Sequence, residues 1–168
     1  MLEILKITDE MADDIGRIGF LSWNSAYKNI IPDDFLKEYT ADKRAAAMRN
    51  SLLSRSEDFY MFKYNEAPAG FAIIGTSQDS GTNDSTGEIH AIYFDPDYWG
   101  LGCAGEAMAF CLNRLKELGY SRIVLWVLEE NLRAIKFYEK HGFSNTGLKR
   151  EITIGKPLNE VCFSLVLG

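Results

Sequence analysis

The sequence is poor in cysteine and histidine and has no excess of positive charge. Its 168 residues include three cysteines and two histidines, and 18 basic against 24 acidic side chains give a formal net charge of -6. Because Cys103, Cys111 and Cys162 cannot all pair and lack the spacing of a metal site, we expect small buried thiols, no metal and a reducing cytoplasm. An acidic chain is unsuited to non-specific nucleic-acid binding, so no nucleic-acid partner is expected.

Long hydrophobic runs and targeting signals are also lacking. The longest apolar run covers residues 123–128, far short of the roughly 20 residues that a membrane-spanning helix needs. The first residues, MLEILKITDEMADD, are acidic and have no signal-peptide pattern. We therefore expect a cytoplasmic protein without a membrane partner. No repeat or shift in composition marks a second domain, so residues 1–168 are expected to form a single domain with a sizeable core.

Hydrophobic periodicity predicts a mixture of strands and helices. Strands are expected over residues 2–8, 59–64, 70–76, 88–95, 123–128, 143–154 and 160–167. Helices are expected over residues 9–28, 33–39, 41–53, 104–118 and 131–141, and an exposed hairpin tip over residues 77–87. This order predicts a mixed α/β fold: a mostly antiparallel sheet of six to seven strands, four to five flanking helices and a central strand–loop–helix unit.

A glycine-rich loop opens the helix of that central unit. Gly100, Gly102 and Gly105 fit the dinucleotide-binding pattern G-x-G-x-x-G, and Glu129 and Glu130 follow at the distance expected of a ribose-binding acid. Two features oppose this interpretation. Five residues separate the strand from the first glycine, and residues 106–168 are too few to complete a six-stranded doubly wound sheet. A dinucleotide-binding oxidoreductase is therefore the minor alternative.

The loop is nevertheless suited to hold a diphosphate. The start of a helix leaves backbone N–H groups without partners and carries partial positive charge, so a phosphate group placed there is stabilised. Glycine lets the backbone approach the phosphate and adopt positive φ. The simpler alternative is that Gly100 and Gly102 only form a tight turn and a helix cap.

Two segments resemble the GNAT superfamily of N-acetyltransferases. Residues 92–104, IYFDPDYWGLGCA, are similar to the acetyl-CoA signature Arg/Gln-x-x-Gly-x-Gly/Ala, with Gly102 and Ala104 matching and Trp99 in place of Arg or Gln. Residues 125–143, LWVLEENLRAIKFYEKHGF, are similar to the second cofactor segment, Asn-x-x-Ala-x-x-Phe-Tyr-x-x-x-Gly-Phe. The resemblance implies a GNAT-like fold and the activity of a bacterial N-acetyltransferase of the small-molecule type.

The resemblance also implies acetyl-CoA as co-substrate. Its pyrophosphate is expected on the N–H groups of Trp99, Gly100, Leu101, Gly102, Cys103 and Ala104, with Gly105 mainly a helix-start residue. Its pantetheine arm is expected to enter where the sheet splays and to pair with the backbone of Ile92, Tyr93 and Phe94. Asn131 is expected both to cap its helix and to bind the pantetheine.

Acetyl transfer to an amine needs a proton acceptor and a proton donor. Glu88 is the candidate base, directly or through water, and His90 on the same strand face is the alternative. Tyr138 lies two helical turns after Asn131 and is the implied acid for the CoA thiolate. Since Cys103 has no evident histidine partner, we expect direct transfer without an acyl-enzyme.

The acceptor substrate is indicated by few residues of the sequence. The resemblance implies that residues 23–32 form the wall over the acceptor site. Trp23 and Tyr27, four residues apart, could stack there on a cationic amine, although packing in the core explains them as well. The resemblance implies an amine of a small molecule or peptide. A catalytically silent acyl-CoA-binding module is the alternative function. Many members of the family are dimers, so a homodimer is left open.

Overall fold

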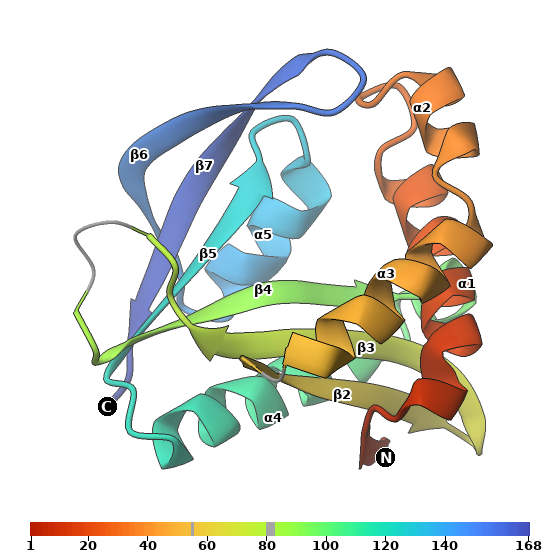
Figure 1. The fold of residues 1–168 in the computed structure, drawn as a ribbon. Coiled ribbons are helices and arrows are strands. Elements are labelled where there is room, and N and C mark those ends of the chain that lie inside the picture. The colour runs from red at the N-terminus through yellow and green to blue at the C-terminus, as the bar shows by residue number, and fades with distance from the viewer. Residues whose placement is uncertain (55, 80–82) are drawn as a thin grey trace.

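A seven-stranded sheet runs through the molecule in the order β1-β2-β3-β4-β5-β7-β6 (Figure 1). The structure is a computed structural model that describes residues 1–54, 56–79 and 83–168. The strands are β1 Glu3–Lys6, β2 Glu57–Tyr64, β3 Ala67–Thr76, β4 Thr86–Phe94, β5 Arg122–Leu128, β6 Ser144–Thr153 and β7 Pro157–Val166. The helices are α1 Ala12–Ala26, α2 Asp33–Glu38, α3 Ala41–Ser54, α4 Cys103–Glu117 and α5 Leu132–Lys140, with short 3-10 turns at Asp9–Met11 and Pro96–Tyr98.

The predicted fold class is confirmed, because all strand pairs are antiparallel except β4–β5, which is parallel. Several boundaries were wrong. The first strand is shorter than residues 2–8, and the helix expected over residues 9–28 begins with a 3-10 turn and ends at Ala26. Asn65 and Glu66, with φ of 49° and 67°, form a two-residue turn, so β3 begins at Ala67 rather than at residue 70. No helix of the described residues is long and apolar enough to cross a membrane.

The predicted hairpin tip at residues 77–87 needs a similar correction. Its last two residues, Thr86 and Gly87, already belong to β4, where they pair with Arg122 and Ile123 of β5. Residues 80–82 of the predicted tip lie outside the described residues.

Helices cover both faces of the sheet. The apolar side of α4 is buried against one face, together with β-strand residues such as Phe62 and Ile123. On the other face α1 and α3 pack against β2 and β3 (Figure 1). The two helices meet closely at Gly16, where an added Cβ would lie 2.3 Å from the carbonyl oxygen of Ala41. This contact fixes the position of α1, which carries Trp23 near its C-terminal end.

The sheet opens between its central strand, β4, and the neighbouring β5. Pairing of β4 with β5 extends only from Thr86–Arg122 to Glu88–Val124, whereas both strands continue beyond it. A β-bulge lies at this point: Ile89 and Ala91 pair with consecutive residues of β3, so His90 is the extra residue. Figure 1 shows β4 and β5 running in diverging directions beyond the bulge, with α5 beside the opening. Beyond Glu88, β4 retains a backbone partner on the β3 side alone within the described chain.

Candidate active site

A cavity of about 450 Å³ lies where β4 and β5 separate. It brings together residues from α1, β4, the glycine loop and α5 that are far apart in the sequence. The predicted site residues that line it are Trp23, Tyr27, His90, Ile92, Tyr93, Phe94, Trp99, Ala104, Asn131 and Tyr138. The side chain of Glu88 does not line it, and neither do Gly100, Leu101, Gly102, Cys103 and Gly105, which form the adjoining loop and helix start.

The glycine loop has the conformation of an anion-binding turn. Gly100 and Gly102 have φ of +79° and +84°, and no atom lies within 4 Å of the position that a Cβ would occupy on either. Gly102 is the N-cap residue of α4. Within the described chain the N–H groups of Gly100, Leu101 and Gly102 donate no hydrogen bond. Free donors, open space and the positive end of a 15-residue helix therefore coincide at one place.

A buried carboxylate holds the segment of residues 95–99, which connects β4 to the glycine loop. Asp95 accepts a hydrogen bond of 3.0 Å from the N–H of Asp97 and forms an ion pair of 2.9 Å with Arg17 of α1. Trp99 is fixed as well, because its indole N–H donates to the carbonyl oxygen of Phe94 at 3.0 Å. The five residues that separate strand from glycine thus form an ordered turn that delivers Gly100 to the cavity edge.

Cys103 and Gly105 serve the helix rather than the cavity surface. Cys103 is 2% exposed, and burial raises the pKa of its thiol, which argues against a nucleophilic role. Gly105 lies inside α4, where an added Cβ would meet the His141 ring at 3.7 Å.

Asn131 and Tyr138 line the cavity from opposite ends of α5. The side chain of Asn131 accepts a hydrogen bond of 3.3 Å from the N–H of Ala134, so the predicted helix cap is confirmed. The Tyr138 ring packs edge-on against Phe137 and Phe143. Burial, with a smaller contribution from Tyr93, raises the pKa of Tyr138, so its hydroxyl stays protonated and can donate. That hydroxyl forms no hydrogen bond with any other described residue.

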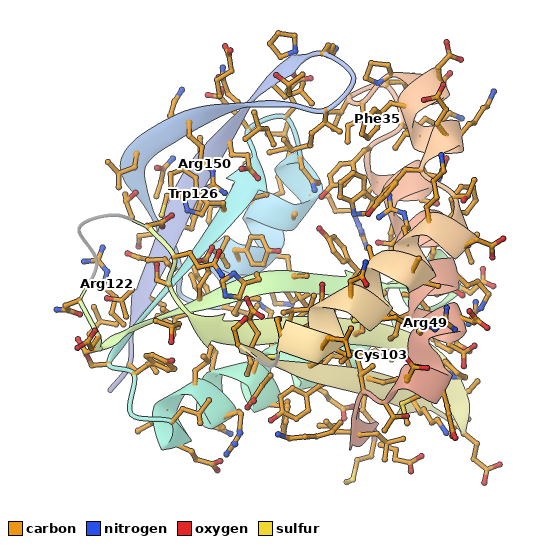
Figure 2. All side chains as sticks on the ribbon, viewed as in Figure 1. Phe35, Arg49, Cys103, Arg122, Trp126 and Arg150 are labelled. Atoms are coloured by element: carbon orange, nitrogen blue, oxygen red, sulfur yellow. The ribbon has the colours of Figure 1, made fainter. Side chains whose placement is uncertain are left out.

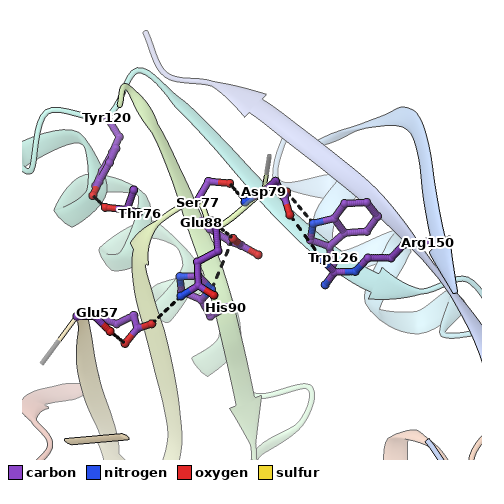
Figure 3. Close-up of polar contacts among 11 residues, drawn as sticks. Glu57, Thr76, Ser77, Asp79, Glu88, His90, Tyr120, Trp126 and Arg150 are labelled. Carbon is purple, nitrogen blue, oxygen red and sulfur yellow. Dashed lines mark hydrogen bonds and ion pairs between the residues drawn. The ribbon is translucent and has the colours of Figure 1, made fainter. Parts of the chain in front are cut away.

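Glu88 and His90 form a pair at the bulge (Figure 3). The His90 Nδ1 atom lies 3.6 Å from Glu88 Oε2, and Glu88 is 6% exposed. Burial raises the pKa of Glu88, while His90 and the Gln78 N–H, which donates to Oε2 at 3.3 Å, oppose this rise. The predicted placement of both side chains on one face is confirmed. His90, whose Nε2 atom is buried without a hydrogen-bond partner among the described residues, is the member of the pair that lines the cavity.

Aromatic rings enclose the far end of the cavity. Trp23 and Tyr27 meet edge-to-face with centroids 5.1 Å apart, and Tyr93 lies 6.4 Å from Trp23. The Arg44 guanidinium is stacked 4.3 Å from the Trp23 ring and 4.3 Å from the Tyr39 ring. The sequence suggested either core packing or a cavity wall for Trp23 and Tyr27. In the structure both residues do both, because they pack against other core residues and also line the cavity.

A second set of polar contacts was not found from the sequence. Trp126 of β5 lines the cavity, and its indole N–H donates to Asp79 Oδ2 at 2.8 Å (Figure 3). Arg150 of β6 stacks on Trp126 at 4.1 Å and donates through Nε to Glu160 Oε1 at 2.9 Å. Glu160 of β7 places a carboxylate at the cavity wall. Alternation along β5 could have placed Trp126 on one face, but its two partners, Asp79 and Arg150, come from two other segments and follow no local pattern.

Trp126 also borders a second cavity, of about 800 Å³, on the open face of β5, β7 and β6. Its cationic members are already engaged. Lys149 pairs with Glu129, Arg150 with Glu160, and Arg122 donates to Ser164. Figure 2 shows Trp126 and Arg150 together on this part of the molecule, far from Arg49 on α3.

Comparison with known proteins agrees with the geometry. Residues 23–143 match the model of the Acetyltransferase (GNAT) family. An uncharacterized N-acetyltransferase of Methanocaldococcus jannaschii is 34% identical over 94 residues, which cover 55% of this chain and 42% of that protein. An uncharacterized N-acetyltransferase of Bacillus subtilis is 25% identical over 173 residues and 94% of each chain. The chain thus matches less than half the length of the first of these relatives and nearly all of the second.

Solved structures share the whole fold. The PaiA N-acetyltransferase of Thermoplasma acidophilum, crystallised in complex with coenzyme A, superimposes with a TM-score of 0.76 over 99% of both chains at 16% identity. At that identity the likeness shows the architecture, including a sheet of the same kind.

Proposed function

The chain belongs to the acetyltransferase (GNAT) family, and we propose that it transfers an acetyl group from acetyl-CoA to an amine of a small molecule or a peptide. One observation carries the proposal: a single cavity extends from Trp99 and Ala104, which flank the glycine loop, past the unpaired part of β4, to aromatic rings of α1. The structural relative from Thermoplasma acidophilum is a complex with coenzyme A, which supports the same ligand class here.

We propose that the glycine loop and β4 hold the two halves of this co-substrate. The free N–H groups of Gly100, Leu101 and Gly102 would receive the pyrophosphate at the start of α4. The pantetheine amides would pair with the β4 backbone at Ile92–Phe94, on the side where β5 has diverged. An extended amide chain fits such an edge because it restores the hydrogen bonds of a missing strand. Asn131 stands at the wall of this passage.

In the proposed reaction a neutral amine attacks the thioester carbonyl of acetyl-CoA. A C–N bond forms, the C–S bond breaks, and CoA thiolate is released. An amine with the pKa of lysine is neutral in only about 1 molecule in 1,000 at pH 7, a cost of about 4 kcal/mol unless the site removes the proton. The Glu88–His90 pair would accept this proton. His90 lines the cavity and Glu88 lies beside it, so the proton would reach Glu88 through His90 or through water.

Tyr138 would serve the leaving group. Its hydroxyl is protonated and lines the cavity. Because burial raises the pKa of this phenol, full proton transfer to a thiolate is unfavourable, and a hydrogen bond that strengthens as charge develops on sulfur is the better-supported role.

The acceptor would bind at the aromatic end. Trp23 and Tyr27 offer aromatic surface, part of which on Trp23 is covered by the Arg44 guanidinium, and Glu160 adds a carboxylate that is already bonded to Arg150. This lining suits an amine carried on an apolar or aromatic group.

The cytoplasm is the proposed location, since Cys103, Cys111 and Cys162 are all free and buried. A homodimer stays a prediction, to be tested by the mass of the protein in solution.

The direct experiment is a thiol-release screen of acetyl-CoA against polyamines, amino acids, aminoglycosides and peptide N-termini. Release that depends on one acceptor class supports the proposal and names the substrate. Tight binding of CoA without thiol release from any acceptor would instead indicate an acyl-CoA-binding module. Enhancement of nicotinamide fluorescence without CoA binding would indicate a dinucleotide-binding oxidoreductase.

A further inference from the structure

Trp126 lines both of the cavities described above. The cavity of about 450 Å³ is the proposed site of acetyl-CoA and the acceptor, and the cavity of about 800 Å³ lies over β5, β7 and β6. No other described residue borders the two together. The side chain of Trp126 therefore forms a partition between the two spaces.

The indole of this residue projects from the acceptor side of β5. Side chains alternate along a strand, so Trp126 and Leu128 share one face of the sheet. Leu128 belongs to the same buried cluster as Tyr27 of the proposed acceptor end, whereas Val127 belongs to the core that contains α4. Pairing of β5 with β4 ends at Val124, so Trp126 lies where the two strands have separated.

Two neighbours hold the indole in place (Figure 3). Its N–H donates to Asp79 Oδ2 at 2.8 Å, and the guanidinium carbon of Arg150 lies 4.1 Å from the ring centroid. Arg150 is anchored in turn, through Nε to Glu160 Oε1 at 2.9 Å and through Nη1 to Asp79 Oδ1 at 3.6 Å. Because rotation of the ring would break both the charge-assisted hydrogen bond and the stacking contact, the partition is fixed.

Buried side chains close the first cavity at its α1 end. Tyr27 and Leu128 line it there, and their buried cluster also contains Ile31, Leu36 and Leu158. The cavity must also receive the acetyl-pantetheine arm of the proposed co-substrate, so only part of its 450 Å³ is left for the acceptor. A longer acceptor would have to extend past Trp126, where the second cavity provides about 800 Å³.

We propose that Trp126 limits the acceptor to a small amine by keeping longer acceptors out of the second cavity. An acceptor that is extended at the end remote from its amine would have to displace an indole that is held on its edge and on one face. Exclusion of this kind discriminates between substrates through the cost of a steric clash. The inference rests on the proposed function, and it favours the small-molecule acceptor over the peptide.

Bisubstrate conjugates of CoA test this role without reliance on turnover. In each conjugate the CoA sulfur is joined through a CH2–CO group to the amine of glycinamide, triglycine amide or pentaglycine amide, so the probes differ only in length beyond the reacting nitrogen. Calorimetric titration measures their Kd values for the wild type, for Trp126→Ala and for the control Leu148→Ala. Leu148 is an exposed residue that lines the second cavity alone, so its truncation enlarges that cavity and leaves the partition intact.

The wild type should bind the pentaglycine conjugate about 10- to 100-fold more weakly than the glycinamide conjugate. Trp126→Ala should bind the two conjugates alike, because removal of the indole joins the cavities. Leu148→Ala should retain the difference that the wild type shows. Trp126→Phe, whose ring is smaller and lacks the N–H, should reduce the difference in part, and it takes the place of Trp126→Ala if that variant does not fold.

Equal binding of all three conjugates by the wild type would overturn the inference, since no acceptor length would then be excluded. A length dependence that persists unchanged in the Trp126 variant would overturn it as well, because another part of the site would impose the limit. A wild-type protein that binds neither CoA nor the glycinamide conjugate would refute the proposed function itself. Normal binding of both, without dependence on length, refutes only the role of Trp126.

Discussion

His90 Nδ1 lies 3.6 Å from Glu88 Oε2 on one side of β4, at the residues where the strand is bulged and parts from β5. The pair proposed to accept the proton therefore lies beside the opening between the two strands. Glu88 is shielded, while His90 is in contact with the cavity. Glu88 and His90 are therefore treated together as one proposed proton acceptor.

The acetyl-transfer rate should depend on pH through this pair. Burial raises the pKa of Glu88, so its protonated form persists to higher pH than in an ordinary glutamate. A base works only when deprotonated, so kcat/KM should rise with pH across an acid limb displaced upward from the usual glutamate range. Glu88→Gln should lower kcat/KM by roughly 100-fold and remove that limb. Initial-rate measurements between pH 5 and 9 test this prediction. If kcat/KM had the same magnitude and pH dependence in the wild type and in Glu88→Gln, Glu88 would not be part of the general base.

The pKa of Glu88 also has a consequence for stability. A carboxyl group whose pKa is higher in the folded than in the unfolded protein favours the folded state while it is protonated, and this contribution is lost as pH rises through the folded pKa. Glu88→Gln cannot ionise, so the variant should gain stability relative to the wild type as pH rises from 4 to 8. Urea unfolding at both pH values measures the difference, and a constant difference between the two proteins would contradict the expectation.

Removal of the Tyr138 hydroxyl should affect turnover more than binding. Tyr138→Phe keeps the ring packing against Phe137 and Phe143 but removes the donor, so kcat should fall by roughly 100-fold while the Kd for CoA changes little. Tyr120→Phe is the matched control, because its hydroxyl bonds Thr76 on a distant strand end. Stopped-assay turnover and calorimetry separate the two effects. If Tyr138→Phe had the kcat of the wild type with a good acceptor, Tyr138 would not be the proton donor.

The glycine loop offers a comparison between two helix ends. Gly102 at the start of α4 and Gly119 just after its end have φ of +84° and +96°, and an added Cβ meets nothing within 4 Å at either. Alanine at each position should therefore cost a similar 1 to 2 kcal/mol, about the strain of the left-handed conformation. Only Gly102→Ala should also weaken CoA binding, since its methyl group would occupy the space proposed for the phosphate. Equal CoA affinities in the two variants would argue against a phosphate at this loop.

The packing of α1 on α3 gives a second glycine comparison. Gly16→Ala would place a methyl group 2.3 Å from the Ala41 carbonyl oxygen, whereas Gly19→Ala meets its nearest neighbour, an Arg44 carbon, at 3.4 Å. Overpacking against backbone should destabilise Gly16→Ala by about 1 to 3 kcal/mol. Gly19→Ala should be neutral or stabilising by up to about 1 kcal/mol, because alanine favours the helix. Thermal unfolding measures both, and equal stability of the two variants would show that the helices can separate at no cost.

The sequence by itself determined the elements and the cofactor segment. Periodicity of 3.6 or 2 residues reflects which side of an element is buried, so strand and helix types followed from local pattern, as in α4. The glycine loop and the Asn131 cap are likewise local, because a few consecutive residues set the backbone conformation and the direction of its N–H groups. Boundaries failed at Asn65–Glu66, where positive φ in non-glycine residues closed a tighter turn than the composition suggested.

Only the tertiary structure decided what faces the cavity. The separation of β4 from β5 depends on a bulge and on strand twist, which no periodicity encodes, and it determined that His90 rather than Glu88 lines the opening. Trp126 with Asp79 and Arg150, and Arg133 on Trp99, join segments far apart in the chain. Such pairs form because the whole sheet and α5 bring their side chains within reach. The sequence therefore determines the chemical type of each side chain, whereas the packing of the complete fold determines which side chains contact one another.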